Sequence, residues 1–304
     1  MLALAALLAL GSADPGGVTV DPLTLQDDDF ARHRDPAIWQ GLKVERIEFR
    51  EDRVRWRLHR ITSIARPKGP LWLVLHDNEH GAFDAALVAV RAYGGTVVAV
   101  DSGVHPEHDG QRFNYAVDRG APVDPNRNFD PATPLYTAAM MGGWKPGDGP
   151  IVALHTNTRG FDTRLSTCNR GDGPGNGVIS IRFCDARYTP HPSLAKAWPF
   201  DDDDTLVFVP HRAGTDPRTG FCWRLWEADY NVVEEIVGVS DRSISNYATP
   251  RGYDYLTLET LDSGSAPAAL ADQRDRLMAM VDRAFETCVP EIPRTGLAER
   301  GIRP

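Results

Sequence analysis

The sequence predicts a single-domain α/β protein with three layers, α/β/α, around a mixed, mostly parallel twisted sheet. Two apolar runs, residues 71–75 and 151–154, contain no alternating polar residues and are typical of strands buried on both faces. A helical pattern follows the first run, which indicates a strand that leads into a helix. The chain has 304 residues, and α/β proteins of this length often form one domain.

The sheet is expected to open with an antiparallel hairpin. Residues 44–49 and 54–61 alternate apolar and polar side chains on either side of Glu51-Asp52. Residues 160–225 are irregular, with Gly and Pro, and are interpreted as loops that shape a cleft. The other regular elements are expected at residues 82–93 (helix), 96–101 (strand), 206–209 (strand), 255–261 (strand) and 268–288 (amphipathic helix).

Polar residues at the ends of the two buried strands predict a metal site. His76 and Glu79 follow the run 71–75, and His155 follows the run 151–154. The carboxyl ends of strands form the edge at which open α/β sheets bind ligands. Imidazole and carboxylate both bind Zn²⁺, and a hydrolytic zinc needs three protein ligands and an open position. We therefore expect zinc at His76, Glu79 and His155, although each residue taken alone would suit a solvated loop.

The polar segment Asp124-Pro125-Asn126-Arg127-Asn128-Phe129-Asp130 lies between these strands and indicates a carboxylate-binding site. Arginine presents a planar fork that matches a carboxylate in a bidentate manner, and an adjacent asparagine adds a further donor. The alternative is a polar loop in which Arg127 caps a helix or pairs with Asp124 or Asp130.

Glu259 is the second carboxylate of interest. Residues 255–261 alternate, so that Tyr255, Thr257 and Glu259 share one face of a strand. Glu259 therefore lies among apolar neighbours, where an unpaired carboxylate is costly. It is either a surface residue of an edge strand or a general base held beside a metal-bound water.

In this order, the motifs resemble those of zinc metallocarboxypeptidases of the carboxypeptidase A type. The Asp-x-Asn-Arg-Asn-aromatic-Asp segment is the most specific match, and the resemblance extends over roughly residues 44–285. The roles that it implies are zinc binding by His76, Glu79 and His155, binding of the substrate's terminal carboxylate by Asn126 and Arg127, and activation of water by Glu259.

Two further roles in that family have candidates in this chain. A tyrosine closes over the substrate, and Tyr247 in Ser245-Asn246-Tyr247-Ala248 is the candidate. A second arginine, upstream of the Asn-Arg pair, polarises the scissile carbonyl. Arg112 is the better candidate for this arginine, and Arg119 is the other.

The chain departs from the digestive members of the family after its third ligand. Those enzymes have Ser-Tyr there, whereas this chain has Thr156-Asn157-Thr158. That segment is similar to the histidine segment of the aspartoacylase and succinylglutamate desuccinylase branch. The branch prefers Gly around its first histidine, where Val74-Leu75 and Asp77-Asn78 stand here. The chain resembles a compact bacterial branch near the peptidases that trim peptidoglycan stems.

The resemblance implies a zinc-dependent hydrolase that cleaves an amide bond next to a free carboxylate. The expected reaction is that of a carboxypeptidase, a metallopeptidase acting on peptidoglycan stem peptides. One alternative is a zinc-dependent deacylase of small N-acyl amino acids. A second is a non-enzymatic binding module on the same fold. The expected partner is a peptide or muropeptide, and the sequence leaves the oligomeric state open.

Export to the periplasm or the medium is expected from the first residues. Residues 1–10 form an apolar run too short to span a bilayer, and Gly11-Ser12-Ala13 precede Asp14 as at a signal-peptidase site. The run has no basic region before it, which leaves open a start further upstream, and a buried N-terminal helix is the alternative. The expected segments are a signal peptide (1–13), an N-terminal extension (14–43), the catalytic domain (44–290) and a C-terminal tail (291–304).

The charge limits the class of partner, and the four cysteines fit an exported protein. The formal net charge is −9 and the pI about 5.5, which argues against a nucleic-acid partner. We expect no integral membrane segment, since no later stretch is long and apolar enough. Cys168 and Cys184 bracket a Gly-rich loop that a disulfide could pin, and Cys222 and Cys288 are a possible second pair. The connectivity stays open at this point.

Overall fold

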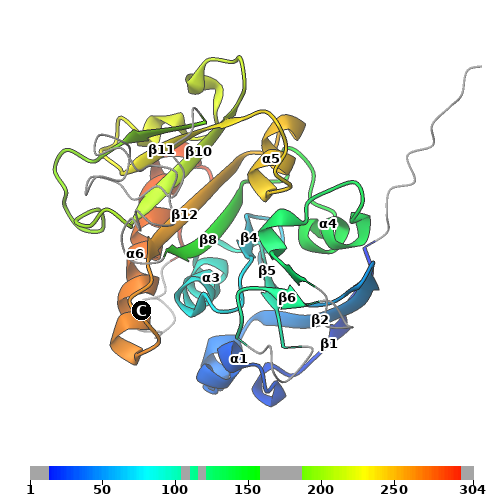
Figure 1. Ribbon diagram of the computed structural model, residues 1–304. Helices are drawn as coiled ribbons and strands as arrows, with labels where there is room; N and C mark the ends of the chain where they lie inside the picture. Colours follow the sequence, from blue (N-terminus) through cyan, green and yellow to red (C-terminus); the bar gives the residue numbers. More distant parts are fainter. Residues whose placement is uncertain (1–13, 104–109, 116–120, 158–186, 296–304) are drawn as a thin grey trace, which may run out of the picture.

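A large mixed sheet with helices on both faces forms the protein (Figure 1). The structure, a computed structural model, describes residues 14–103, 110–115, 121–157 and 187–295. The strands of the large sheet, in spatial order, are β1 (Val18–Thr19), β2 (Leu42–Glu51), β3 (Val54–Ser63), β5 (Thr96–Asp101), β4 (Leu71–Val74), β8 (Ile151–Asn157), β12 (Tyr255–Leu261), β10 (Leu206–Arg212), β11 (Val232–Val237) and β9 (Tyr188–His191).

The centre of this sheet is parallel. Strands β5, β4, β8 and β12 run in the same direction, and β10 pairs with β11 in parallel as well. The other pairings in the large sheet are antiparallel. A small antiparallel sheet contains β6 (Asn114–Tyr115) and β7 (Pro122–Val123). The predicted single-domain α/β fold is confirmed.

Helices cover both faces of the sheet, which gives the three expected layers (Figure 1). The α-helices are α1 (Asp28–Arg32), α2 (Pro36–Trp39), α3 (His80–Tyr93), α4 (Pro134–Met141), α5 (Ile244–Ala248) and α6 (Pro267–Cys288). The 3₁₀ helices are η1 (Pro22–Thr24), η2 (Pro125–Arg127), η3 (Pro217–Thr219), η4 (Trp223–Leu225) and η5 (Thr249–Arg251).

Strand β4 shows how the sequence builds the layers. Trp72 and Val74 pack into the apolar core beneath α3 and α6, whereas Leu71 and Leu73 pack into the core beneath α4 and α5. Successive side chains of a strand point to opposite faces, so a strand covered on both faces must be apolar throughout. This explains the uninterrupted apolar run from which the strand was predicted.

The predicted hairpin is confirmed, and its turn follows Glu51. Asp52 has φ 52°, a left-handed conformation that Asp adopts more readily than most residues. Of the range 160–225, residues 160–186 lie outside the described residues. For the rest, the interpretation as loops is wrong in part, because β9, η3 and η4 lie there. Strand β9 carries Pro190 and pairs only on one side, at the edge of the sheet, where proline is tolerated.

A disulfide joins Cys222, at the start of η4, to Cys288, at the end of α6. It is the second pair that the sequence suggested. Cys168, Cys184 and the expected signal peptide lie outside the described residues. Among the residues that are described, no helix is long and apolar enough to cross a membrane.

Candidate active site

The carboxyl ends of β4 and β8 bring three candidate ligands together. Val74, the last residue of β4, is in register with Leu154 of the neighbouring β8, and the chain then continues to His76 and His155. Glu79 occupies the N-cap position of α3, but its side chain makes no capping hydrogen bond. It points instead toward the two histidines.

Glu79 lies between the two imidazoles. Nδ1 of His76 is 2.7 Å from Oε1 of Glu79, and Nδ1 of His155 is 2.8 Å from Oε2. The backbone N–H of Thr156 donates to the same Oε2 at 3.1 Å. All three candidate ligands are buried, and one ligand atom of each lies within 4.8 Å of the others. The structure thus groups the three residues as candidate metal ligands.

Charge interactions at this point favour an ionised carboxylate. Burial alone would raise the pKa of Glu79, but His76 and His155 outweigh it and hold that pKa well below its usual range. Burial tends to lower the pKa of His76, yet Glu79 and Asp124 together raise it. The two neighbouring imidazoles thus favour the ionised form of Glu79.

Asp124 is a residue whose role the sequence did not reveal. Its Oδ1 lies 2.9 Å from Nε2 of His76 and also accepts the backbone N–H of Asn126 at 2.8 Å, which caps η2. Burial raises the pKa of Asp124, but the hydrogen bond with His76 lowers it to about 2. A carboxylate on the outer nitrogen of a histidine fixes the ring and leaves the inner nitrogen for a metal.

The donor set fits zinc. Two imidazoles and one carboxylate are the protein ligands of one class of catalytic zinc sites. The Nδ1 atoms of His76 and His155 face the two oxygens of Glu79, one each, and the contact of Asp124 with the outer nitrogen of His76 fixes that ring.

Arg112 reaches the same point from the segment before β6. Its Nη1 donates to Oε1 of Glu79 at 2.8 Å, and its side chain is 40% exposed. A guanidinium has five N–H donors, so others remain for a substrate oxygen. Arg119, the other candidate, lies outside the described residues.

Glu259 is the direct neighbour of His155 across the β8–β12 pairing. It faces a cavity of about 80 Å³ whose wall also includes Asn126, Arg127 and Glu235. Burial raises the pKa of Glu259, and His155 opposes that effect. Because β12 lies inside the sheet, between β8 and β10, Glu259 is not a surface residue of an edge strand.

Asn126 and Arg127 lie in η2, on the wall of the same cavity. Oδ1 of Asn126 accepts the backbone N–H of Ile244, which positions its amide. Arg127 is exposed, and its Nε lies 3.7 Å from Oδ2 of Asp241. The two aspartates suggested as partners of Arg127 contact other residues: Asp124 contacts His76, and Asp130 contacts Arg242 at 3.2 Å.

Tyr247 lies in α5 on the wall of a separate cavity of about 430 Å³. Tyr253 and Trp144 share that wall, and the guanidinium carbon of Arg251 lies 4.1 Å from the centre of the Tyr247 ring. The structure does not bring Tyr247 to the cavity that Glu259 faces. The Tyr247 ring instead packs against Phe129, with 6.0 Å between the two ring centres.

No protein-family model and no curated protein matches the chain. Several solved structures are similar to it. Ectoine utilization protein EutE (DoeB) from Ruegeria pomeroyi has 14% identity and a TM-score of 0.43, covering 90% of this chain and 72% of that one. A succinylglutamate desuccinylase from Silicibacter sp. TM1040 has 11% identity and a TM-score of 0.44, covering 94% and 73%. Cell shape determinant protein Csd4 from Helicobacter pylori has 12% identity and a TM-score of 0.41, covering 74% and 51%.

Proposed function

We propose that the protein is a zinc-dependent hydrolase that cleaves an amide bond next to a free carboxylate. The observation that carries this proposal is the convergence of His76, Glu79 and His155, with Glu259 on the neighbouring strand. Zinc would be held by the first three residues, and it would supply a Lewis acid that polarises the carbonyl and acidifies water.

Glu259 would act as the general base. It takes a proton from the attacking water and then delivers it to the leaving nitrogen. Burial raises its pKa, which makes it a better proton acceptor than a solvated carboxylate. Arg112 would stabilise the negative charge that develops on the carbonyl oxygen, the interaction that is usually largest in such reactions.

Asn126 and Arg127 would bind the free carboxylate of the substrate. Both line the cavity that Glu259 faces, and Arg127 is exposed enough for its fork to meet a ligand. We keep Tyr247 as the candidate that covers bound substrate. Its helix begins at Ile244, which binds Asn126 directly.

Peptidoglycan stem peptides are the substrate that we propose, because they carry several carboxylates and lie outside the cytoplasm. The Cys222–Cys288 disulfide supports an oxidising compartment. Thr156-Asn157-Thr158, which follows the third ligand, favours small N-acyl amino acids as the second candidate.

Digestion of purified muropeptides, with product masses read by mass spectrometry, tests the choice. Loss of a terminal amino acid supports the carboxypeptidase. Release of an acyl group from N-acyl amino acids, with muropeptides left intact, supports the deacylase. A zinc-loaded protein that cleaves neither class would contradict both.

The metal assignment has its own test. Metal analysis of the purified protein should find zinc at this site, and His76→Ala and His155→Ala should each lose it. Retention of zinc at wild-type occupancy in both variants would show that the ligands are different.

A further inference from the structure

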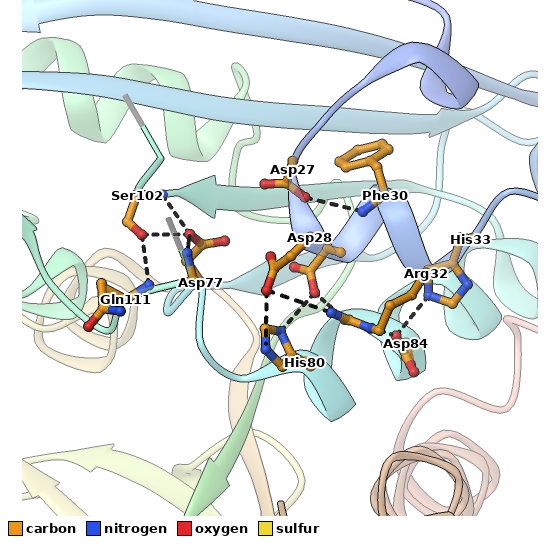
Figure 2. A network of polar contacts seen from close by, with 12 residues as sticks. Asp27, Asp28, Phe30, Arg32, His33, Asp77, His80, Asp84, Ser102 and Gln111 are labelled. Atoms are coloured by element: carbon orange, nitrogen blue, oxygen red, sulfur yellow. Dashed lines mark hydrogen bonds and ion pairs between the residues drawn. The ribbon is translucent and has the colours of Figure 1, made fainter. Parts of the chain in front are cut away.

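A second cluster of potential metal ligands lies beneath the N-terminal segment. Asp27 precedes α1, His59 lies in β3, and Asp101 ends β5. One ligand atom from each of the three lies within 4.8 Å of the other two. Asp27 also forms an overlapping group with Asp28 and Asp77 on the same criterion. Figure 2 shows Asp27, Asp28 and Asp77 facing one another across a small space.

The environment of the His59 side chain indicates that a ligand binds there. Its side chain is 2% exposed, and its buried Nε2 has no hydrogen-bond partner among the described residues. Its Nδ1 lies 3.9 Å from Oδ2 of Asp101, beyond hydrogen-bond distance. Burial, and then Arg57 and Arg46, lower the pKa of His59 to about 3. The imidazole is thus neutral, the form that offers a lone pair to a cation.

Two carboxylates of the cluster contact no cationic side chain within the described parts of the chain. Asp27 is 9% exposed, and its Oδ1 accepts only the backbone N–H of Phe30. Asp77 is 2% exposed, and three neutral donors from Ser102 and Gly110 reach its Oδ2. The other oxygen of Asp77, Oδ1, is buried without a partner. Burial, with Asp29 and Asp101 nearby, raises the pKa of Asp27 to about 8.

The surrounding acids differ from these two in having basic partners. Those pairs, several of which Figure 2 draws, are Asp28 with His80 and Arg32, Asp29 with Arg32 and His80, Asp84 with His33 and Arg32, and Asp101 with Arg57. Buried charges in proteins are usually paired or bind a metal. Among the described residues of this cluster, the carboxylates without a basic partner are therefore Asp27 and Asp77, and Nε2 of His59 is also without a partner.

We propose that Asp27, His59 and Asp101 bind a divalent metal ion, with Asp77 and Asp28 beside it. The ligands are mainly carboxylate oxygens with one imidazole, a set that suits Mn²⁺. The ion would connect the N-terminal segment to strands β3 and β5, and its ligands are different from His76, Glu79 and His155, where we propose zinc. The site thus joins residues that are far apart in the sequence, and no short motif would reveal it.

Mn²⁺ titration of a protein that lacks the first site tests this proposal. The background is His76→Ala/His155→Ala, stripped with a chelator, and bound Mn²⁺ is counted by electron paramagnetic resonance. We expect one Mn²⁺ per chain and a rise in Tm on binding. Asp27→Asn and His59→Gln should each weaken binding at least about tenfold, since each removes one ligand.

Asp35→Asn is the matched control. Asp35 caps α2 as Asp27 caps α1, with its carboxylate accepting a backbone N–H, but it lies outside the cluster. The affinity of the Asp35→Asn variant for Mn²⁺ should equal that of the background protein. If His59→Gln fails to fold, Asp27→Asn decides alone, because asparagine keeps the capping hydrogen bond.

Three results would overturn the proposal. The first is no Mn²⁺ bound by the background protein, which would mean that protonation of the aspartates compensates the cluster. The second is equal affinity in Asp27→Asn and the control. The third is binding of Ca²⁺ alone, unchanged in His59→Gln, which would exclude the imidazole as a ligand.

Discussion

At the scale of single residues, Glu259 separates catalysis from metal binding. Glu259→Gln keeps the shape of the side chain but removes the proton acceptor, so kcat should fall by at least about a hundredfold. Zinc content should be unchanged, because Glu259 is next to His155 and is not among the converging ligands. Steady-state kinetics and metal analysis of the same preparation check this. Full activity in Glu259→Gln would exclude the proposed mechanism.

Arg127 should bind the substrate's terminal carboxylate. Arg127→Ala removes a contact made in both ground and transition states, so the loss should appear mainly in KM. Amidating the substrate's terminal carboxylate should weaken hydrolysis by the wild type and scarcely affect hydrolysis by the variant. Arg242→Ala is the control, since Arg242 is an exposed arginine nearby that pairs with Asp130. If Arg127→Ala discriminates against the amidated substrate as the wild type does, another residue reads the carboxylate.

Glu235 should make stability depend on pH. Burial raises its pKa from 4.5 to about 7, while Ser245 donates a hydrogen bond to it. Between these pH values the unfolded state ionises and the folded state does not, so stability is lost as pH rises. Glu235→Gln should recover on the order of 3 kcal/mol in the free energy of unfolding at pH 7 and above, and nothing below pH 4.

Urea unfolding at several pH values measures this difference. The variant Glu227→Gln, at an exposed position, is the control and should follow the wild type throughout. A gain from Glu235→Gln that is the same at pH 4 and pH 8 would show that titration of Glu235 is not its cause.

At the scale of elements, prediction succeeded where one physical requirement controls the sequence. Strands β4 and β8 are covered on both faces, so their residues had to be apolar, and the expected grouping of His76, Glu79 and His155 followed from that assignment. Strand β11 was not predicted, because Glu234 and Glu235 interrupt its apolar residues. The Glu235 carboxylate is accommodated by Ser245 of another element, which no local pattern reveals.

The position of α5 was equally beyond local patterns. Its placement depends on packing and on the hydrogen bond from Ile244 to Asn126, residues far apart in the chain. The resemblance alone therefore suggests Tyr247, and the structure places it on the wall of a separate cavity. Local patterns likewise could not reveal the cluster of Asp27, His59 and Asp101, because its members come from three separate elements.

The Cys222–Cys288 disulfide should stabilise the packing of η4 against α6. The bond closes a loop of 66 residues, and such a loop corresponds to about 2 to 4 kcal/mol of stability. Cys222→Ala/Cys288→Ala should lower the free energy of unfolding by that amount in a urea titration. An unchanged midpoint in the double variant would mean that the rest of the core holds these elements unaided.

At the scale of the whole molecule, zinc should matter more for activity than for folding. The apolar cores on the two faces of the sheet include none of the candidate ligands, and a chain of this size does not need zinc to fold. Without zinc, Glu79 is still compensated by His76 and His155. Stripping zinc with a chelator should therefore abolish hydrolysis but lower Tm by less than about 10 °C, the scale expected for loss of one tightly bound ligand.

Circular dichroism should show retained secondary structure, and added Zn²⁺ should restore activity. Global unfolding in the chelator would mean instead that a metal is part of the fold, and Mn²⁺ rescue of the fold without activity would assign that role to the cluster at Asp27.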